Sequence, residues 1–137
     1  MFLDLGERKL DLKQPKIMGV LNMTPDSFSD GGKYLSLDDA FSACVKMVKE
    51  GASVIDIGGE STRPGAAEVS SEQQLDRVIP IILKVKQNLD TIISIDSGNA
   101  TVIREAAENG AEIINDVFAL TKKMQSLRPL KQIRQFV

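Results

Sequence analysis

Four short apolar runs are spaced along the first 117 residues. They cover residues 16–22, 52–57, 91–96 and 111–117, and each ends at or near a polar side chain. Continuous apolar runs of this length, rich in isoleucine and valine, are typical of strands buried on both faces of a sheet. The pattern therefore predicts four buried strands.

Between these runs, apolar residues recur at helical spacing. A capping box at Ser36 predicts the start of a first helix, and Gly51 follows its end. Ser71 with Gln74 predicts the start of a second helix, and a third is predicted over residues 99–109. The predicted order is βα, βα, βα, β, and we find no signal for an antiparallel hairpin.

This alternation predicts an α/β fold in which parallel strands are joined by right-handed crossovers. Asn22, Asp56, Asp96 and Asn115 lie at or near the carboxyl ends of the four strands. Both TIM barrels and open parallel sheets build their active sites at that end. We therefore expect these four side chains to share one edge of the sheet.

Composition limits the chemistry available to these side chains. The 137 residues are 42% apolar and 26% charged, which is ordinary for a globular domain but short of the roughly 250 residues of a full TIM barrel. The absence of histidine excludes His-based metal sites and a Ser-His-Asp triad from this chain. The lone Cys44 falls on the apolar face of a predicted helix, so a buried thiol is expected. Residues 1–12 contain no apolar run, which predicts neither a signal peptide nor a membrane span and favours the cytoplasm.

Two glycine- and proline-containing loops follow the first two strands. The first carries polar side chains around Phe28, and a plain solvated connection is the alternative reading. The second, residues 58–65, offers backbone N–H groups, Thr62 and Arg63 to an anion such as phosphate.

The polar groups that end the strands have two readings. Asp96 and Asn115 carry the acceptor and donor groups needed to read the edge of a flat heterocycle, although an Asp there equally caps the next helix. For Asp56 we favour a structural interpretation, in which it is a buried carboxylate held by N–H groups of the following loop.

Four segments together resemble the dihydropteroate synthases, a pterin-binding family of the folate pathway. They are MGVLNMTPDSFSDGG, VIDIGGESTRPGA, SIDS and INDV, in the family's order and spacing, and the resemblance covers residues 16–118. It implies a (β/α)8 TIM-barrel family fold, of which about the first four strands and three crossover helices are present. It also implies a transferase that joins 6-hydroxymethyl-7,8-dihydropterin pyrophosphate to 4-aminobenzoate and releases pyrophosphate.

The resemblance assigns roles residue by residue. Asn22 matches the family's Mg²⁺ and pyrophosphate position, and Thr62 and Arg63, with the adjacent Ser61, match the loop that contacts the pyrophosphate-bearing substrate. Asp96 and Asn115 match pterin-reading positions. Phe28 and Pro64 match loop residues that shape the aminobenzoate pocket, where sulfonamides compete. The implied catalytic residues are Asn22, Thr62, Arg63 and Asp96.

After Val117 the resemblance fades. Residues 121–137 carry five basic and no acidic side chains, whereas residues 1–120 carry 12 basic and 19 acidic ones. We therefore divide the chain into the amino-terminal half of a pterin-binding barrel, residues 1–119, and an atypical basic tail, residues 120–137. A frameshift or premature stop is favoured over a natural short form, and weak or no synthase activity is expected.

Two other functions stay open. One is a noncatalytic pterin-binding fragment; the other is the pterin-binding domain of a methyltetrahydrofolate methyltransferase, which the loops MTPDSF and GGESTRPG disfavour because they suit a pyrophosphate substrate. Small-molecule substrates are expected, and neither nucleic acid nor membrane partners are. The family relation implies a homodimer, which a half-barrel need not form.

Overall fold

In the described part of the chain, five parallel strands form the central sheet. The computed structural model describes residues 1–24, 35–61, 63–116 and 134–136. The sheet has the order β3–β4–β5–β6–β7, and every neighbouring pair is parallel. Its strands are β3 (Ile17–Asn22), β4 (Ala52–Gly58), β5 (Ile92–Asp96), β6 (Ile113–Asn115) and β7 (Arg134–Phe136).

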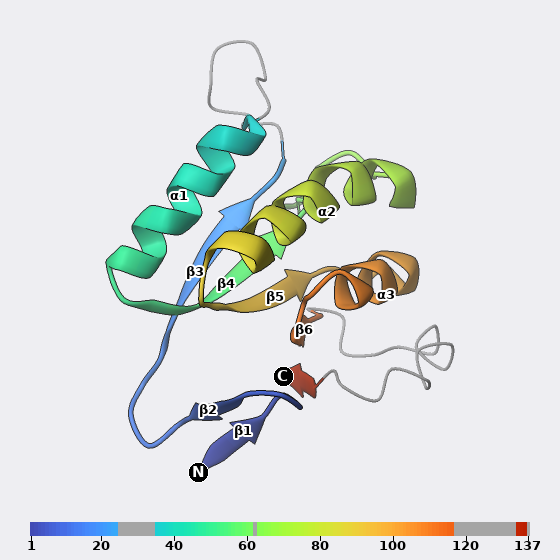
Figure 1. The fold of residues 1–137 in the computed structure, drawn as a ribbon. Helices are drawn as coiled ribbons and strands as arrows, with labels where there is room; N and C mark the ends of the chain where they lie inside the picture. Colours follow the sequence, from blue (N-terminus) through green and yellow to red (C-terminus); the bar gives the residue numbers. More distant parts are fainter. Residues whose placement is uncertain (25–34, 62, 117–133, 137) are drawn as a thin grey trace.

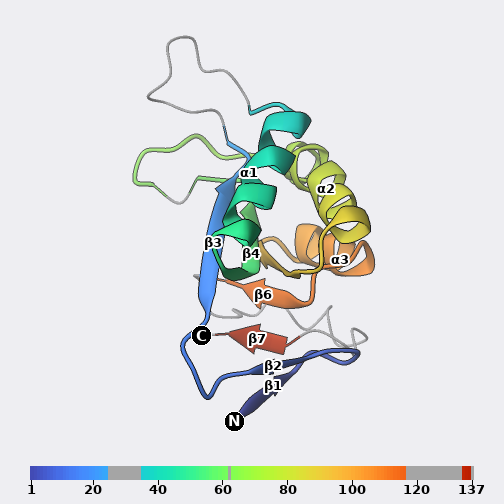
Figure 2. The ribbon, with the colours of Figure 1, turned by 60° about the vertical axis from the view of Figure 1, so that its left-hand side comes forward.

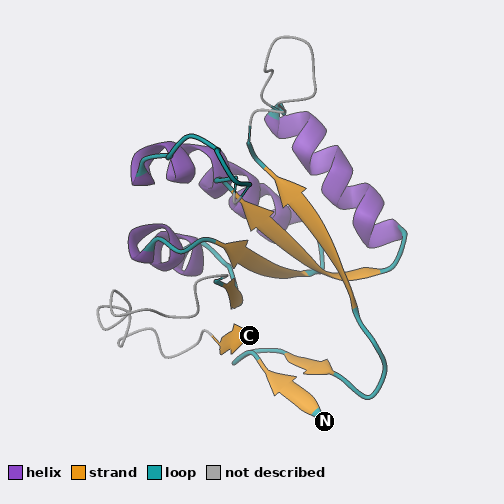
Figure 3. Ribbon diagram, turned by 180° about the vertical axis from the view of Figure 1, so that it is seen from behind, coloured by secondary structure: helices purple, strands orange, loops and turns teal. Residues whose placement is uncertain are grey.

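Three crossover helices connect the first four of these strands. They are α1 (Leu37–Lys49), α2 (Ser71–Asn88) and α3 (Ala100–Glu108), and all lie on one side of the sheet (Figures 1 and 2). Seen from behind, the strands stand in front of the helices, so the opposite face of the sheet is not covered by a helix of the described part (Figure 3). This is the arrangement of a barrel wall, in which helices cover the outside and the uncovered face is the interior.

The outer face of the sheet forms the main hydrophobic core. Isoleucines alternate along β4 and β5 so that one set faces the helices, and their side chains are fully buried (Ile55, Ile57, Ile93 and Ile95). Cys44 of α1 lies in the same core, and burial raises the pKa of its thiol to about 11. The prediction of a buried cysteine is confirmed.

An antiparallel hairpin precedes the sheet and was not predicted. Strands β1 (Phe2–Asp4) and β2 (Lys9–Asp11) pair, with Leu3 opposite Leu10. Leu5 and Leu10 pack against the first part of the sheet's interior face and form a second apolar cluster with Val54, Ile92 and Ile113. Leucines at every second position before and after Gly6, which adopts a φ of 91°, are a weak hairpin pattern that the sequence prediction did not use.

The helix boundaries follow the sequence closely, with one correction. Ser36 caps α1 as predicted, but α2 is capped by Ser70 with Gln73 in the capping box, one residue before the predicted pair. The predicted partner, Gln74, is instead 2% exposed and bonds to residues of the neighbouring loops. Because the side chain of Gln74 bonds to neighbouring loops, Gln73 completes the capping box, and the N-cap is Ser70, one residue before the predicted Ser71.

The fourth predicted strand is shorter than expected, and a fifth is present. β6 covers only Ile113–Asn115, and β7 pairs with it in parallel although its residues belong to the predicted tail. Residues 117–133, which hold most of that tail, lie outside the described residues. No helix in the described part of the chain is long and apolar enough to cross a membrane.

Candidate active site at the carboxyl ends of the strands

The last interior-facing positions of four strands form one row across the sheet. Asn22 of β3 pairs with Gly58 of β4, Gly58 pairs with Asp96 of β5, and Asp96 pairs with Asn115 of β6. Residues paired in register point to the same side of a sheet. The predicted meeting of Asn22, Asp96 and Asn115 at one edge therefore agrees with the strand register.

Gly58 leaves a gap in the middle of this row. A Cβ atom placed there would lie 3.5 Å from the Asp96 Oδ2 atom, so the carboxylate borders the space that a side chain would fill. Asn22 on the other side of Gly58 is exposed. The row thus offers an open position flanked by an amide and a carboxylate.

A second row lies one layer deeper, where Val20, Asp56, Ser94 and Ile113 are paired in register. Asp56 is 3% exposed, and its Oδ2 atom accepts a hydrogen bond of 3.0 Å from the Asn115 Nδ2 atom. Loop N–H groups, which the sequence reading suggested as its partners, make no hydrogen bond to Asp56 in the described residues. The carboxylate is buried, as expected, but it is tied to Asn115.

Acidic groups gather around Asp96. Burial, the largest cause, and the negative charges of Asp56, Asp116 and Glu60 together raise the pKa of the Asp96 carboxyl group from 3.8 to about 6. A carboxyl group with this pKa exchanges its proton near neutral pH. The surroundings of Asp96 therefore favour ligands that present N–H donors and disfavour anions.

The loop after β4 begins beside the end of β3. The Met23 N–H donates to the Gly58 carbonyl over 2.7 Å, which ties the start of the first loop to the start of the second. The Ser61 hydroxyl accepts from the Arg63 N–H over 3.3 Å, and Gly65 adopts a φ of 81°. Arg63 and Pro64 of the same loop are exposed.

Phe28 and Thr62 lie outside the described residues, so their predicted contacts with substrate stay predictions. The remaining candidates divide by depth: Asn22 and Asp96 with Asn115 form the row, while Ser61, Arg63 and Pro64 belong to the loop above it.

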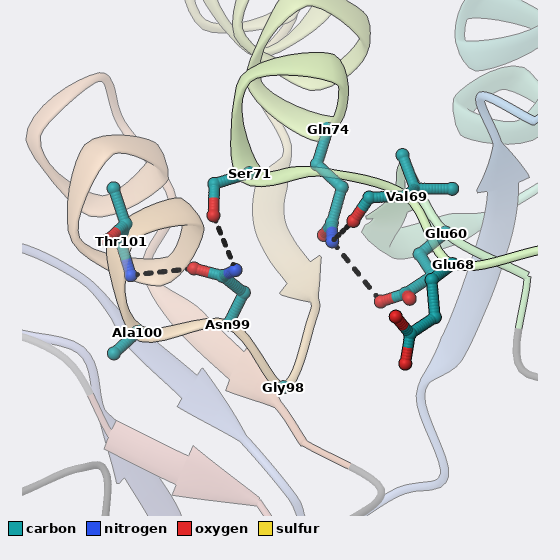
Figure 4. A pocket seen from close by; sticks show the side chains of 9 residues that line it. All are labelled: Glu60, Glu68, Val69, Ser71, Gln74, Gly98, Asn99, Ala100 and Thr101. Atoms are coloured by element: carbon teal, nitrogen blue, oxygen red, sulfur yellow. Dashed lines mark hydrogen bonds between the residues drawn. The ribbon is translucent and has the colours of Figure 1, made fainter.

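A polar pocket of about 550 Å³ lies beside the row, between the first turns of α2 and α3 (Figure 4). Gln74 bridges its walls: its Nε2 atom donates to Glu60 (3.2 Å) and its Oε1 atom accepts from the Ser97 hydroxyl (3.0 Å). Asn99 donates to the Ser71 hydroxyl over 2.7 Å. The sequence reading missed this network, which holds the Glu60 side chain of the second loop against α2.

The described residues include no group of three or more acidic, histidine or cysteine side chains able to hold a metal ion. Mg²⁺ in proteins is commonly held by one or two protein oxygens, with water and substrate phosphates completing the octahedron. The exposed side-chain amide oxygen of Asn22 suits such a site, because a Mg²⁺ ion of this kind needs only one or two ligands from the protein.

Comparison with known proteins agrees with this arrangement. A family model described as pterin binding enzyme matches residues 18–136. Dihydropteroate synthase of Haemophilus influenzae is 53% identical over 120 residues, which is 88% of this chain and 44% of that protein. The match of the family model beyond residue 118 extends the resemblance into the region assigned to the tail.

Solved structures show the same fold. The crystal structure of 7,8-dihydropteroate synthase from Vibrio fischeri matches with a TM-score of 0.87 and 44% identity, covering 98% of this chain and 47% of that one. Dihydropteroate synthase of Xanthomonas albilineans with 4-aminobenzoic acid matches with a TM-score of 0.85 and 41% identity, covering 96% and 49%. The chain thus spans a little under half the length of these relatives, with the α/β fold of the TIM-barrel family, and it belongs to the pterin-binding enzyme family.

Proposed function

We propose that the protein acts in folate biosynthesis as a dihydropteroate synthase-type transferase of the cytoplasm. Its substrates would be 6-hydroxymethyl-7,8-dihydropterin pyrophosphate and 4-aminobenzoate. The observation that carries the proposal is the interior row, in which Asp96 and Asn115 are paired in register at the carboxyl ends of β5 and β6. The family match and the relatives' names support the same substrate class.

The charges of the site suggest how the substrate lies. The acidic surroundings of Asp96 favour the N–H-bearing edge of a pterin in the interior, because that edge donates to carboxylate and amide oxygens. The same charges repel a pyrophosphate, which belongs at the mouth of the site near Asn22 and the exposed guanidinium of Arg63. Thr62 and Ser61 would add donors there.

The proposed reaction exchanges one bond for another. The nitrogen lone pair of 4-aminobenzoate forms a bond to the methylene carbon of the pterin, while the carbon–oxygen bond to pyrophosphate breaks and its electron pair leaves with the oxygen. The amine then loses a proton. Arg63 would stabilise the charge on the leaving pyrophosphate, and Phe28 with Pro64 would border the aminobenzoate.

Mg²⁺ is part of the proposal. It would supply charge neutralisation at the pyrophosphate, and Asn22 would hold it through its side-chain oxygen. The exposed position of Asn22 at the end of β3, beside the gap at Gly58, supports this role.

A binding experiment tests the pterin site. Isothermal titration calorimetry of the purified chain with 6-hydroxymethylpterin should show saturable binding that Asn115→Ala weakens by about tenfold or more, the effect of a lost buried hydrogen bond. Asp76→Asn, an exposed position on α2 outside the site, is the matched control and should bind like the wild type. No binding by the folded wild-type chain would contradict the pterin assignment.

An activity experiment separates a transferase from a binding module. The chain, free of host enzyme, is incubated with the pterin pyrophosphate, 4-aminobenzoate and Mg²⁺, and dihydropteroate is measured by chromatography. Product that requires all three supports the transferase. Pterin binding without product supports the noncatalytic module instead.

Self-association is also proposed. Three side chains of β3, the terminal strand of the described sheet, are both apolar and exposed: Ile17 (60%), Met18 (41%) and Val20 (54%). An exposed apolar edge strand favours pairing with another chain, in keeping with the homodimer that the family relation implies. Analytical ultracentrifugation should show a dimer at micromolar concentration, and a strictly monomeric chain would contradict this.

A further inference from the structure

The inference concerns Asp56, the buried carboxylate one layer below the row, and rests on the function proposed above. Among the described residues, the side chain of Asn115 makes one hydrogen bond, the 3.0 Å contact from its Nδ2 atom to the Asp56 Oδ2 atom. Asn115 is the pterin-reading candidate with both a donor and an acceptor. The contact that fixes the orientation of this amide therefore decides whether its oxygen or its N–H group faces the ligand.

A carboxylate determines the orientation of an amide in one direction only. It accepts hydrogen bonds and does not donate them, so the nitrogen of Asn115 must face Asp56. The amide oxygen then points to the other side, with the second N–H beside it. Without Asp56, rotation by 180° about the last side-chain bond would exchange the acceptor for the donor.

The surroundings of Asp56 indicate that this contact is its main role. Its Oδ1 atom is buried without a hydrogen-bond partner in the described residues, and so is the hydroxyl of Ser94, which is paired with it in register. Burying a carboxyl group with half of its bonding capacity unused lowers the stability of a fold. Retaining such a group beside the site is typical of residues that serve function at the expense of stability.

We infer that Asp56 is a positioning residue that locks the side-chain amide of Asn115, so that Asn115 presents its oxygen as a fixed acceptor to the pterin. The residue acts through Asn115 and is not expected to touch the reacting atoms. Its effect should appear in the affinity for the pterin and in the state of the Asn115 amide.

The test variant is Asp56→Asn, which keeps the shape of the side chain but can both donate and accept. Either orientation of Asn115 then finds a partner, so the lock is lost while the fold is kept. We expect the affinity for 6-hydroxymethylpterin, measured by calorimetry, to fall several-fold to about tenfold. The matched control is Ser94→Ala, the neighbouring buried polar position that makes no hydrogen bond to Asn115, and its affinity should equal that of the wild type.

Two readouts distinguish positioning from a general structural effect. In an Asn115→Ala background, Asp56→Asn should weaken pterin binding no further, because Asp56 acts only through the missing amide. In nitrogen-15 NMR spectra, the side-chain amide of Asn115 should give one slowly exchanging pair of signals in the wild type and in Ser94→Ala. In Asp56→Asn the pair should shift and exchange faster.

The outcomes separate this inference from the proposed function. A folded wild-type chain that binds no pterin contradicts the function, and the NMR comparison still decides whether Asp56 locks the amide. A wild type that binds, with Asp56→Asn binding equally well or the Asn115 amide signals unchanged, overturns the inference and leaves the function standing. An equal loss of affinity with and without Asn115 also overturns it.

Discussion

Replacing Asp96 with asparagine should stabilise the protein at neutral pH. Burial and three neighbouring acidic groups raise the pKa of Asp96 from 3.8 to about 6 in the folded state. Below pH 4 the carboxyl group is protonated in both the folded and the unfolded chain, so its burial adds no charge. As the pH rises through about 6, ionisation in the folded state is disfavoured relative to the unfolded state, and stability is lost.

The size of the effect follows from the shift. A rise of about two pKa units, at 1.36 kcal/mol per unit, corresponds to about 3 kcal/mol when fully expressed. Asp96 is only half-buried, and solvent screening reduces the expected gain of Asp96→Asn to about 1–2 kcal/mol at pH 7.5. The gain should shrink as the pH falls from 6 to 4.

Urea unfolding of the wild type and Asp96→Asn at several pH values between 4 and 8 measures this. Asp38→Asn is the control, because Lys84 lowers the pKa of the exposed Asp38 and the stability it contributes is lost as the pH falls. The two variants should therefore change with pH in opposite directions. A difference between Asp96→Asn and wild type that is the same at pH 4 and pH 7.5 would refute the reasoning.

Three further substitutions test the packing that supports the site, each by urea unfolding against the wild type. Ile95→Ala, in the fully buried outer face of β5, should cost about 2–5 kcal/mol, and Ile95→Val less than half of that; equal costs would contradict tight packing there. Gly59→Ala should cost about 1–3 kcal/mol, because a Cβ would lie 3.0 Å from the Val78 Cγ1 atom and 3.2 Å from the Gln74 carbonyl; an unchanged midpoint would show that α2 moves away freely. Ser70→Ala should cost about 1 kcal/mol through loss of the capping box of α2, and no loss would contradict the cap.

Sequence reasoning worked where local chemistry decides the structure. Ser36 caps α1 because its hydroxyl and backbone suffice for a cap, and Gly51 ends the helix region with a φ of 106°. Composition placed the ends of the first three strands to within one residue, because apolar runs typical of buried parallel strands end there, whereas β6 ends at Asn115 and not at residue 117. Asn22 and Asp96 consequently fall in one row, as the spacing predicted.

The features that the sequence did not predict depend on contacts between distant segments of the chain. The spacing of Gln74 from Ser71 predicted a capping box, yet the Gln74 side chain bonds to Glu60 and Ser97. No local sequence pattern predicts these two contacts. The β1–β2 hairpin has strands of three residues, too short for a strong periodic signal, and gains its support from the sheet it packs against. The link from Asp56 to Asn115 joins positions 59 residues apart and follows only from the register.

The two ends of the interior face serve different purposes, and the position of Asp96 shows how they are divided. The end under the hairpin, where Val54 and Ile92 pack, gains stability from apolar burial. At the end near the carboxyl termini of the strands, burial and the repulsion of neighbouring carboxylates raise the pKa of Asp96 and lower stability. The variant Asp96→Asn should therefore be more stable at neutral pH and yet bind the pterin less well, because it removes the buried negative charge and replaces one carboxylate acceptor with an N–H donor. If the stability and the pterin affinity of Asp96→Asn both rose, the carboxylate of Asp96 would not serve pterin binding.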